Sequence, residues 1–317
     1  MSIDCLCAGI LFADYGCEPI ERMPAPGELV PTNRLHLTLG GCASNAGLDI
    51  AKLGYRVGVS GCVGDDVFGE FVIARLQSGG VDTSGIHRLP DTGTASSLIL
   101  NVQGEDRRFI STAGASGRFS VGHIPHDWVT QAKVFYVGGY LMMPELENDA
   151  MVDLFRRARA AGAKTVLDVV LFEQRPFWEI LDRILPETDV FLPNDDEAKI
   201  LTGLDDPFDQ ANRFRDSGAK TVVITQGERG TILVTEGRRL RAGVYPTQFV
   251  GGTGSGDAFD AGFIAGLIEG ADDAGCLRWG SALGASCVRS IGATESVFTR
   301  SEAEAFMAEH ELVVDEA

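Results

Sequence analysis

The chain has 317 residues, of which 44% are hydrophobic and 23% charged, so it can bury a large core as ordinary globular proteins do. Its formal net charge of −18 argues against nucleic acid and against an anionic membrane surface as partners. The seven cysteines include no CxxC pair and no cluster with zinc spacing, which predicts buried free thiols and a reducing cytoplasm. No apolar run is as long as a membrane span, and the first residues indicate a strand and not a signal peptide.

Apolar runs of strand length alternate with segments of helical period along the chain. Strands are predicted at residues 3–11, 57–64, 133–139, 164–172, 190–194, 220–227 and 230–237. Helices are predicted at residues 43–54, 66–80, 147–162, 196–203 and from residue 257 onward. Because strands that alternate with helices are joined by crossovers, this order predicts an α/β fold, with a doubly wound, mainly parallel sheet sandwiched by helices.

Two regions interrupt this alternation. Residues 15–38 are rich in proline and polar residues, and residues 92–112 alternate apolar and polar positions around a glycine-containing turn, which predicts a hairpin. We expect both regions to form a small β lid, and residues 1–14, 39–91 and 113–317 to form the large domain. Alternatively, both are surface excursions of a single domain. A second subunit could cover the exposed strand edges, which would give a homodimer through the lid.

The segment VGGTGSGD, from Val250 to Asp257, directly precedes an apolar segment of helical period. Glycines let the backbone adopt positive φ and approach a ligand closely, and the first amides of a helix favour an anion. Asp257 lies where this helix begins, and a carboxylate there can take the proton of a hydroxyl that attacks a phosphate. Alternatively, Asp257 is an ordinary first-turn residue that the helix dipole stabilises.

A second glycine-rich turn leads into the helix predicted at residues 43–54. Gly40 and Gly41 allow close approach of the backbone, and the Asn45 side chain offers both a donor and an acceptor. Asp14 follows the first predicted strand, at a carboxyl end where open α/β sheets bind ligands, and its carboxylate can bind two sugar hydroxyls. The plainer alternatives are a helix-start hydrogen bond for Asn45 and a solvated loop position for Asp14.

With two further motifs, these turns fall in the order of the ribokinase-like, or PfkB, sugar kinases, which the chain resembles from about residue 3 to about residue 310. Members of this family are α/β sandwiches with a β lid, and they transfer the γ-phosphate of ATP to a sugar or nucleoside hydroxyl. The matching elements are Asp14, Gly40-Gly41-x-x-x-Asn45, Asn194-Asp-Asp-Glu197, Thr225-Gln-Gly227-x-x-Gly230 and Gly254-Ser-Gly-Asp257.

The resemblance implies a catalytic role for the glycine-rich turn. It makes Asp257 the catalytic base, and it places the transferring phosphoryl group on an anion hole formed by the amides of Gly254, Ser255 and Gly256. This agrees with the chemistry, because phosphoryl transfer depends on positioning and on preorganised donors more than on covalent catalysis.

The resemblance also implies sites for Mg²⁺ and ATP. Asn194 and Glu197 match a motif that organises Mg²⁺ and its waters, although the segment NDDEAKIL is equally a plain helix start with acidic residues in its first turn. Thr225, Gly227 and Gly230 match residues beside the ATP phosphates and ribose.

A helix of small residues near the C-terminus matches the adenine side of the family's nucleotide site. Ala282 and Ser286 are candidates there for the pocket wall, and close packing of that helix is the alternative. On the acceptor side, Asp14, Gly41 and Asn45 match positions that hold the hydroxyls of the acceptor. Phe109, on the predicted lid hairpin, would cover the apolar face of a sugar; its alternative is plain packing within the lid.

The chain departs from the family pattern at three places. Gly251 replaces an aspartate of a loop associated with a monovalent cation, which puts activation by potassium in question. Asp168 keeps the aspartate of a D-x-N-x-R motif, but the asparagine is missing and Arg175 is displaced, which puts the fructokinase and ketogluconate kinase subgroups in question. Tyr140 lies near a position that is acidic in ribokinase proper, which weakens ribose as the acceptor.

We therefore predict an ATP-dependent kinase that phosphorylates a hydroxyl of a small sugar or sugar derivative. A nucleoside kinase of the same family is the nearest alternative. A non-catalytic nucleotide or sugar sensor on this fold is a third hypothesis. Asp257 argues against it, because a protein that only binds its ligands does not require a catalytic base. A dinucleotide-binding oxidoreductase ranks last, because Gly40 and Gly41 lack the G-x-G-x-x-G spacing.

Overall fold

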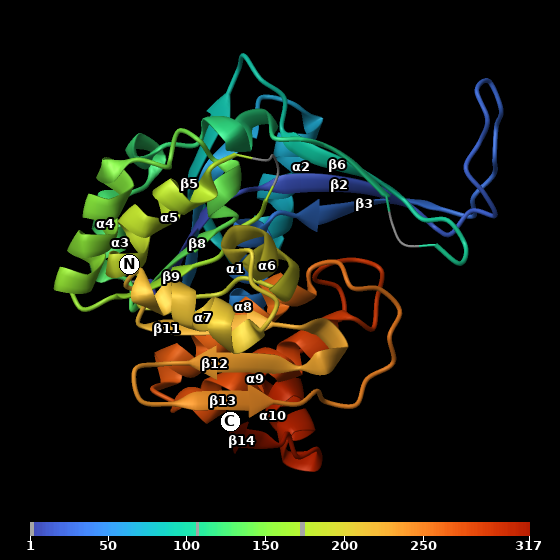
Figure 1. Cartoon of the computed structure of the whole chain (residues 1–317). Helices are drawn as coiled ribbons and strands as arrows, with labels where there is room; N and C mark the ends of the chain where they lie inside the picture. The colour runs from blue at the N-terminus through green and yellow to red at the C-terminus, as the bar shows by residue number, and fades with distance from the viewer. Residues whose placement is uncertain (1–2, 106–107, 172–174) are drawn as a thin grey trace.

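A ten-stranded sheet forms the centre of the computed structural model, which describes residues 3–105, 108–171 and 175–317 (Figure 1). All neighbouring pairs from β5 to β11 are parallel, and β12, β13 and β14 continue the sheet in antiparallel pairs. From one edge to the other the strands are β14 (Val314–Glu316), β13 (Arg239–Ala242), β12 (Thr231–Val234), β11 (Thr221–Thr225), β10 (Val190–Phe191), β9 (Lys164–Leu167), β8 (Val134–Gly138), β1 (Cys5–Gly9), β4 (Val57–Gly64) and β5 (Asp82–Leu89).

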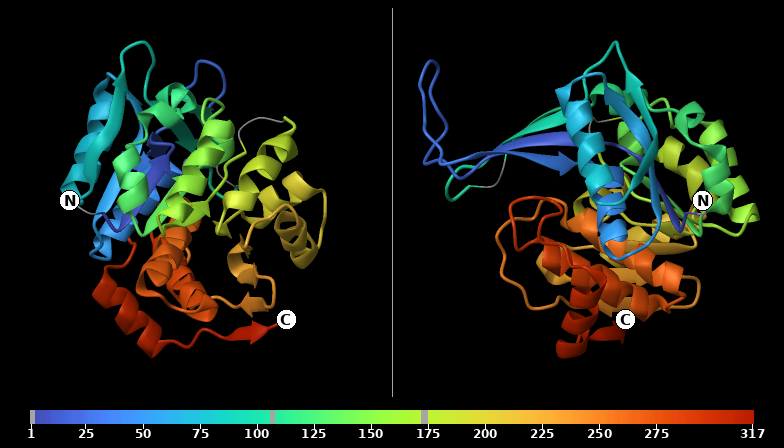
Figure 2. Two further views of the ribbon diagram at one scale, coloured as in Figure 1. Left: turned by 90° about the vertical axis from the view of Figure 1, so that its left-hand side faces the viewer. Right: turned by 180° about the vertical axis from the view of Figure 1, so that it is seen from behind.

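Helices cover both faces of this sheet (Figure 2). One face packs against α1 (Cys42–Lys52), α2 (Val67–Ser78), α8 (Ser255–Glu269), α9 (Asp273–Cys287) and α10 (Arg300–Glu309). The other packs against α3 (His126–Gln131), α4 (Asp149–Ala160), α5 (Phe177–Ile184), α6 (Asp195–Thr202) and α7 (Pro207–Asp216). Alternate residues of β1 point to the two faces, so Cys5 and Cys7 join one buried cluster while Leu6 and Ala8 join the other. The predicted doubly wound α/β sandwich is confirmed.

Sequence periodicity located the long buried strands better than the short or exposed ones. The predicted strand at residues 57–64 coincides with β4, but the one at 164–172 ends at Leu167 as β9, and its last position, Phe172, lies outside the described residues. The prediction missed β5, which is mostly exposed and lacks a regular apolar pattern. The helices α3, α5, α7 and α10 and the edge strands β13 and β14 were also not predicted.

A separate four-stranded sheet projects from the body as a long arm (Figures 1 and 2). Its order is β3 (Leu35–Gly40), β2 (Phe12–Cys17), β6 (Ala95–Leu100) and β7 (Arg108–Thr112). Strands β6 and β7 pair antiparallel, as the predicted hairpin requires, and its residues 106–107 lie outside the described part. The small sheet begins at Phe12 and includes Asp14, which we had expected to follow a strand of the large sheet. The division of the chain into two domains stays a prediction.

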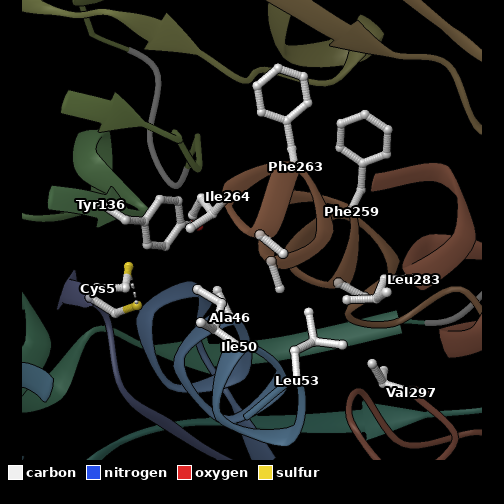
Figure 3. Close-up of a cluster of buried hydrophobic side chains, with 14 of the residues drawn as sticks. Cys5, Ala46, Ile50, Leu53, Tyr136, Phe259, Phe263, Ile264, Leu283 and Val297 are labelled. Atoms are coloured by element: carbon white, nitrogen blue, oxygen red, sulfur yellow. Dashed lines mark hydrogen bonds between the residues drawn. The ribbon is translucent and has the colours of Figure 1, made fainter. Parts of the chain in front are cut away.

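Helices α1 and α8 pack closely on one face of the large sheet, and this packing brings their N-terminal ends together. Small residues such as Ala46 and Ala261 are fully buried between them. Figure 3 shows Ala46 and Ile50 of α1 directed toward the same buried cluster as Ile264 of α8. The two glycine-rich turns identified in the sequence therefore lie side by side at the start of these helices. Within the described residues, no helix is long and apolar enough to cross a membrane.

Candidate active site

The turn before α8 is held in one conformation by glycine. Gly254 caps the helix with φ 79°, a left-handed value that favours glycine. A Cβ atom at this position would lie 2.4 Å from the Cβ of Ala293, so the neighbouring loop also excludes a side chain. The amides of the first turn of α8 have no partners within the helix, and they carry its positive dipole end. The turn is thus built to hold an anion.

Asp257 lies in the first turn of α8. One hydrogen bond connects it to Asn45, near the glycine-rich turn that precedes α1. The side-chain amide of Asn45 donates to Oδ2 of Asp257 over 2.8 Å, which joins α1 to α8. Burial raises the pKa of Asp257, while the hydrogen bonds from Asn45 and from the Cys42 thiol oppose this shift. Because a base with a raised pKa takes up a proton more readily, this environment suits proton transfer better than a solvated carboxylate would.

Asp14 reaches the same place from the small sheet. Its carboxylate lies against Gly40, where an added Cβ atom would approach Oδ2 to 2.1 Å, so only glycine leaves room for it. Burial raises the pKa of Asp14 to about 6, the negative charge of Asp257 adds to the rise, and hydrogen bonds from Ser97 oppose it. The Oδ1 atoms of Asp14 and Asn45 are both buried without a hydrogen-bond partner. Since such atoms are costly to leave unpaired, they mark a place for hydroxyl donors of a ligand.

Further acidic side chains lie near Asp257, and one of them, Asp260, was not singled out in the sequence. Burial, together with the charge of Asp257, raises the pKa of Asp168 to about 8, and it raises the pKa of Glu197 and Asp260 well above the usual range. The Tyr136 hydroxyl donates to Asp260 over 2.9 Å. Asp260 follows Asp257 by three residues on the same helix, a spacing that the sequence does display. Nothing in the sequence pointed to Tyr136, which reaches the site only through the fold.

These carboxyls do not form a closed metal cage. Among the described residues, no group of three or more His, Cys, Asp or Glu side chains is placed to hold a metal ion. Burial is the main cause of their raised pKa values, but the same carboxyls, when they ionise, place negative charge beside the anion-binding turn. A divalent cation held mainly by water and phosphate oxygens would neutralise it, which is the way Mg²⁺ binds at phosphate-transfer sites.

The Asn194 and Glu197 side chains also serve the start of α6. Asn194 Oδ1 accepts from the Glu197 amide over 2.8 Å, and Glu197 Oε2 accepts from the Asn194 amide over 2.9 Å. The two bonds form a reciprocal capping box, as expected if the segment is an ordinary helix start. It occupies one carboxylate oxygen of Glu197. Burial raises the pKa of Glu197, and the charges of Asp168 and Asp257 add to the rise, so the same side chain also borders the acidic cluster.

A cavity of about 720 Å³ opens beside the anion-binding turn. Its wall combines the turn itself with the end of β11, the loop after β13 and one face of α9. The residues around it include Thr225, Gly227, Gly230, Tyr245, Phe249, Ser255, Gly256, Ser281, Gly284, Ala285 and Val288. Three of the predicted nucleotide residues, Thr225, Gly227 and Gly230, therefore line one cavity together with the turn.

The structure corrects the two predicted residues on α9. Ala282 and Ser286 are fully buried and do not line the cavity. The cavity-lining positions of α9 are 281, 284, 285 and 288, which recur with helical spacing on one face, so residues 282 and 286 lie on another. The Ser286 hydroxyl accepts from the amide of Phe298 over 3.1 Å and thus serves packing, the alternative considered for this helix.

The remaining predicted residues surround the acceptor side. Gly41 caps α1 with φ 88°, and a side chain there would clash with the Ile10 carbonyl. Phe109 lies on β7 opposite Ile99, on the same face of the small sheet as Asp14, and is half exposed. Tyr140 is almost completely buried, and its amide donates to the carbonyl of Asp168 over 3.0 Å.

Arg175 does not lie free to bind a substrate. Its guanidinium donates to both carboxylate oxygens of Glu147 and to the carbonyl of Leu141. The Arg175 side chain therefore forms an ion pair within the protein.

Together these residues can perform phosphoryl transfer to a hydroxyl. Asp14 and Asn45 offer unpaired acceptors to the hydroxyls of an acceptor molecule, and Asp257 lies next to them at the turn. The cavity on the other side of the turn has the size of a nucleotide site. An acceptor and a nucleotide would thus meet at the start of α8, where the helix amides stabilise the charge that moves between them.

Comparisons with known proteins agree with this geometry. The family model of the pfkB family carbohydrate kinases matches residues 3–300. Ribokinase of Haemophilus influenzae is 28% identical over 89% of this chain and 91% of its own, and adenosine kinase of Saccharomyces cerevisiae is 30% identical over 86% and 84%. The structure of Arabidopsis thaliana ribokinase complexed with ribose and ATP aligns with a TM-score of 0.83, at 24% identity, over 97% of this chain and 99% of that one.

Proposed function

Because the chain belongs to the pfkB family of carbohydrate kinases and is a phosphotransferase with a hydroxyl acceptor, we propose that it transfers the γ-phosphate of ATP to a hydroxyl of a small neutral sugar or sugar derivative. The observation that carries this proposal is the contact of Asn45 with Asp257 beside the unpaired Oδ1 atom of Asp14. It joins hydroxyl-binding groups, a base and an anion-binding turn in one place. Asp257 acts as the base, and Gly254, Ser255 and Gly256 form the anion hole.

ATP would bind in the cavity along β11 and α9, with its phosphates at the amides of the turn and its ribose beside Gly227 and Gly230. Mg²⁺ would be held by the phosphates and by water, with Glu197 binding one of these waters and Asn194 fixing the helix start. Its charge would offset the repulsion among the acidic side chains around Asp257. When bound, the metal supplies electrostatic stabilisation of the transferred phosphoryl group.

The acceptor side favours a neutral molecule with several hydroxyls. The polar side chains there include Asp14 and Asn45, whose unpaired oxygens accept hydrogen bonds from hydroxyls, and the Asp14 carboxylate would repel an anionic acceptor. Phe109, on the same face of the lid as Asp14, would cover the apolar face of a sugar. A nucleoside is the second candidate, since one relative of this chain is an adenosine kinase.

A screen for acceptor-dependent formation of ADP tests this function. Pentoses, hexoses, deoxy sugars, sugar acids and nucleosides are each incubated with ATP, Mg²⁺ and the enzyme. We expect one neutral sugar to raise ADP formation at least about tenfold over the acceptor-free rate, and a sugar acid to fail. Turnover with nucleosides alone would select the second candidate, and nucleotide binding without turnover on any acceptor would contradict the kinase proposal.

We propose that potassium does not activate the enzyme, because Gly251 has no carboxylate to offer a monovalent cation. Equal rates in potassium and tetramethylammonium buffers are expected, and a rate several times higher in potassium would refute this.

We also place the protein in the cytoplasm. All seven of its cysteines are buried and free, as suits a reducing compartment.

The outer face of the lid supports a homodimer. Cross-strand pairing aligns Leu37, Tyr15, Leu98 and Ile110 in one row across the small sheet, on the face opposite Asp14. All four side chains are exposed, with Ile110 the most exposed at 63%. An apolar row of this kind on a projecting sheet is costly to leave in water, and a second lid would cover it.

A further inference from the structure

One face of α1 carries a second pair of polar residues that the proposed chemistry does not use. Asp49 and Lys52 follow Asn45 by four and seven residues, a spacing that places all three on the same side of the helix. Asp49 is completely buried, and neither of its carboxylate oxygens has a hydrogen-bond partner among the described residues. Its nearest charged partner is Lys52, whose Nζ atom lies 3.5 Å from Oδ1.

Lys52 connects this pair to the loop between α9 and α10. Its ammonium donates to the carbonyl of Thr294, a residue that is itself almost completely buried. Burial raises the pKa of Asp49, and the charge of Lys52 opposes the rise. A lysine held between a buried carboxyl and a buried carbonyl has little freedom, so it fixes the position of that loop relative to α1.

The same loop supports the anion-binding turn. Ala293, the residue before Thr294, packs directly against Gly254, close enough that a Cβ atom on Gly254 would meet it at 2.4 Å. The Cys287 Sγ atom lies 3.0 Å from the carbonyl oxygen of Ala293 and 3.4 Å from that of Thr253, so its single proton bridges the loop and the turn.

We propose that Asp49 and Lys52 are positioning residues. By anchoring the loop at Ala293 and Thr294, they keep the anion-binding turn correctly placed relative to the Asp257 side chain. This proposal rests on the proposed kinase function. Helix α1 then fixes both halves of the site: Asn45 orients the base directly, and Lys52 sets the turn through the loop. Because a misplacement of about 1 Å can lower phosphoryl-transfer rates on the order of a hundredfold, the pair should affect catalysis far more than substrate binding.

The test compares Lys52→Met, Lys52→Arg and the double variant Asp49→Asn/Lys52→Met, all with the best acceptor of the wild type. Lys52→Met should lower kcat by about 10-fold to 100-fold with the acceptor KM within about twofold of wild type, and Lys52→Arg should recover much of the loss. The double variant leaves no unpaired buried charge, so it keeps the chain folded even if Lys52→Met does not. It should show the same loss of kcat.

Lys133→Met is the matched control, since Lys133 pairs with Asp4 at the opposite end of the sheet, where Arg56 still compensates Asp4. It should leave kcat unchanged. Binding of ADP with and without aluminium fluoride gives a second measurement: Lys52→Met should lose most of the gain in affinity that the fluoride gives, while its affinity for ADP alone stays constant. A double variant with the kcat of the wild type would overturn the proposal, whereas a wild type without transfer activity would instead refute the kinase function.

Discussion

At the scale of single residues, the site is defined by carboxyls that the fold keeps partly or fully out of water. Asp14 is the clearest case, because it is buried, has an unpaired Oδ1 atom and lies close enough to Asp257 to feel its charge. Such an arrangement is unfavourable in the free protein and becomes favourable only when hydroxyl donors arrive. It is a feature of a binding site and not of a stable core.

The Asp14→Asn substitution should therefore stabilise the free protein while it impairs function. The pKa of Asp14 is raised from 3.8 to about 6, so the folded state binds the proton more tightly than the unfolded state. Ionising the buried Asp14 carboxyl lowers the free energy of unfolding of the wild type. This loss of stability is absent below about pH 4, grows as the pH rises to 6 and is complete above it, on the order of 2–3 kcal/mol. We expect a higher Tm than wild type at pH 7.5, no difference at pH 4, and an acceptor KM raised at least about tenfold.

Thermal unfolding at the two pH values, together with acceptor titrations at constant ATP, measures both effects. A variant that is less stable than wild type at pH 7.5 would show that the hydrogen bonds from Ser97 outweigh the cost of burying the Asp14 carboxylate, and it would remove the argument for an open hydroxyl site.

At the scale of elements, the site is made by two helix starts that glycine allows to meet. Gly41 begins α1 and Gly254 begins α8, both with positive φ and both in contact with neighbouring backbone or side-chain atoms. Each turn was recognisable in the sequence because glycine clusters before an apolar helix are unusual. Their contact through Asn45 and Asp257 was not recognisable, because 212 positions separate the two residues and only the packing of α1 on α8 joins them.

Gly254→Ala should reduce activity sharply, and Gly270→Ala provides the matched control. Both glycines have left-handed φ at an end of α8, but Gly254 faces Ala293 at 2.4 Å whereas a Cβ atom on Gly270 meets nothing within 4 Å. The control therefore has only the conformational strain, about 1–2 kcal/mol, and should keep its kcat. Gly254→Ala must also displace the turn, and we expect kcat to fall at least about tenfold. Equal kcat values in the two variants would contradict the role of the turn.

The sequence allowed the main elements to be predicted where their pattern depends on their own burial. The runs that became β4 and β11 are buried along most of their length, and their apolar residues indicate this directly. Strand β5 is mostly exposed, so its sequence shows no regular apolar pattern. Helix α7 was missed although Asp206 caps it and Pro207 begins it, which are start signals that the sequence does display. The error at Ala282 and Ser286 arose because small residues occupy both the cavity face and the core face of α9.

At the scale of the whole molecule, the projecting small sheet (Figure 1) has two chemically different faces. One face of the small sheet carries Asp14 and Phe109, while the other carries the exposed row of Tyr15, Leu37, Leu98 and Ile110. Side chains alternate between the two faces of a strand, so the sequence of each strand indicates which residues share a face. The pairing register that aligns the exposed row across four strands does not follow from the sequence of any one strand. A dimer through this face would stiffen the lid over the acceptor.

Leu98→Asp should dissociate such a dimer, because it places a charge in the middle of the row. Leu204→Asp is the control, since Leu204 is similarly exposed but lies after α6, away from the small sheet. Light scattering after size exclusion should give a dimer for wild type and control and a monomer for Leu98→Asp. A wild type that remains monomeric at about 100 μM would exclude the lid interface.

The central claim is that Asp257 takes the proton of the attacking hydroxyl, and one measurement tests it most directly. The kcat of Asp257→Asn is compared with that of wild type and of Asp209→Asn, which alters an exposed acidic residue in the first turn of α7. We predict that Asp257→Asn lowers kcat by about 10²–10⁴-fold with little change in the KM for ATP, and that Asp209→Asn has no effect. An Asp257→Asn enzyme that transfers phosphate within about threefold of the wild-type rate would contradict the account.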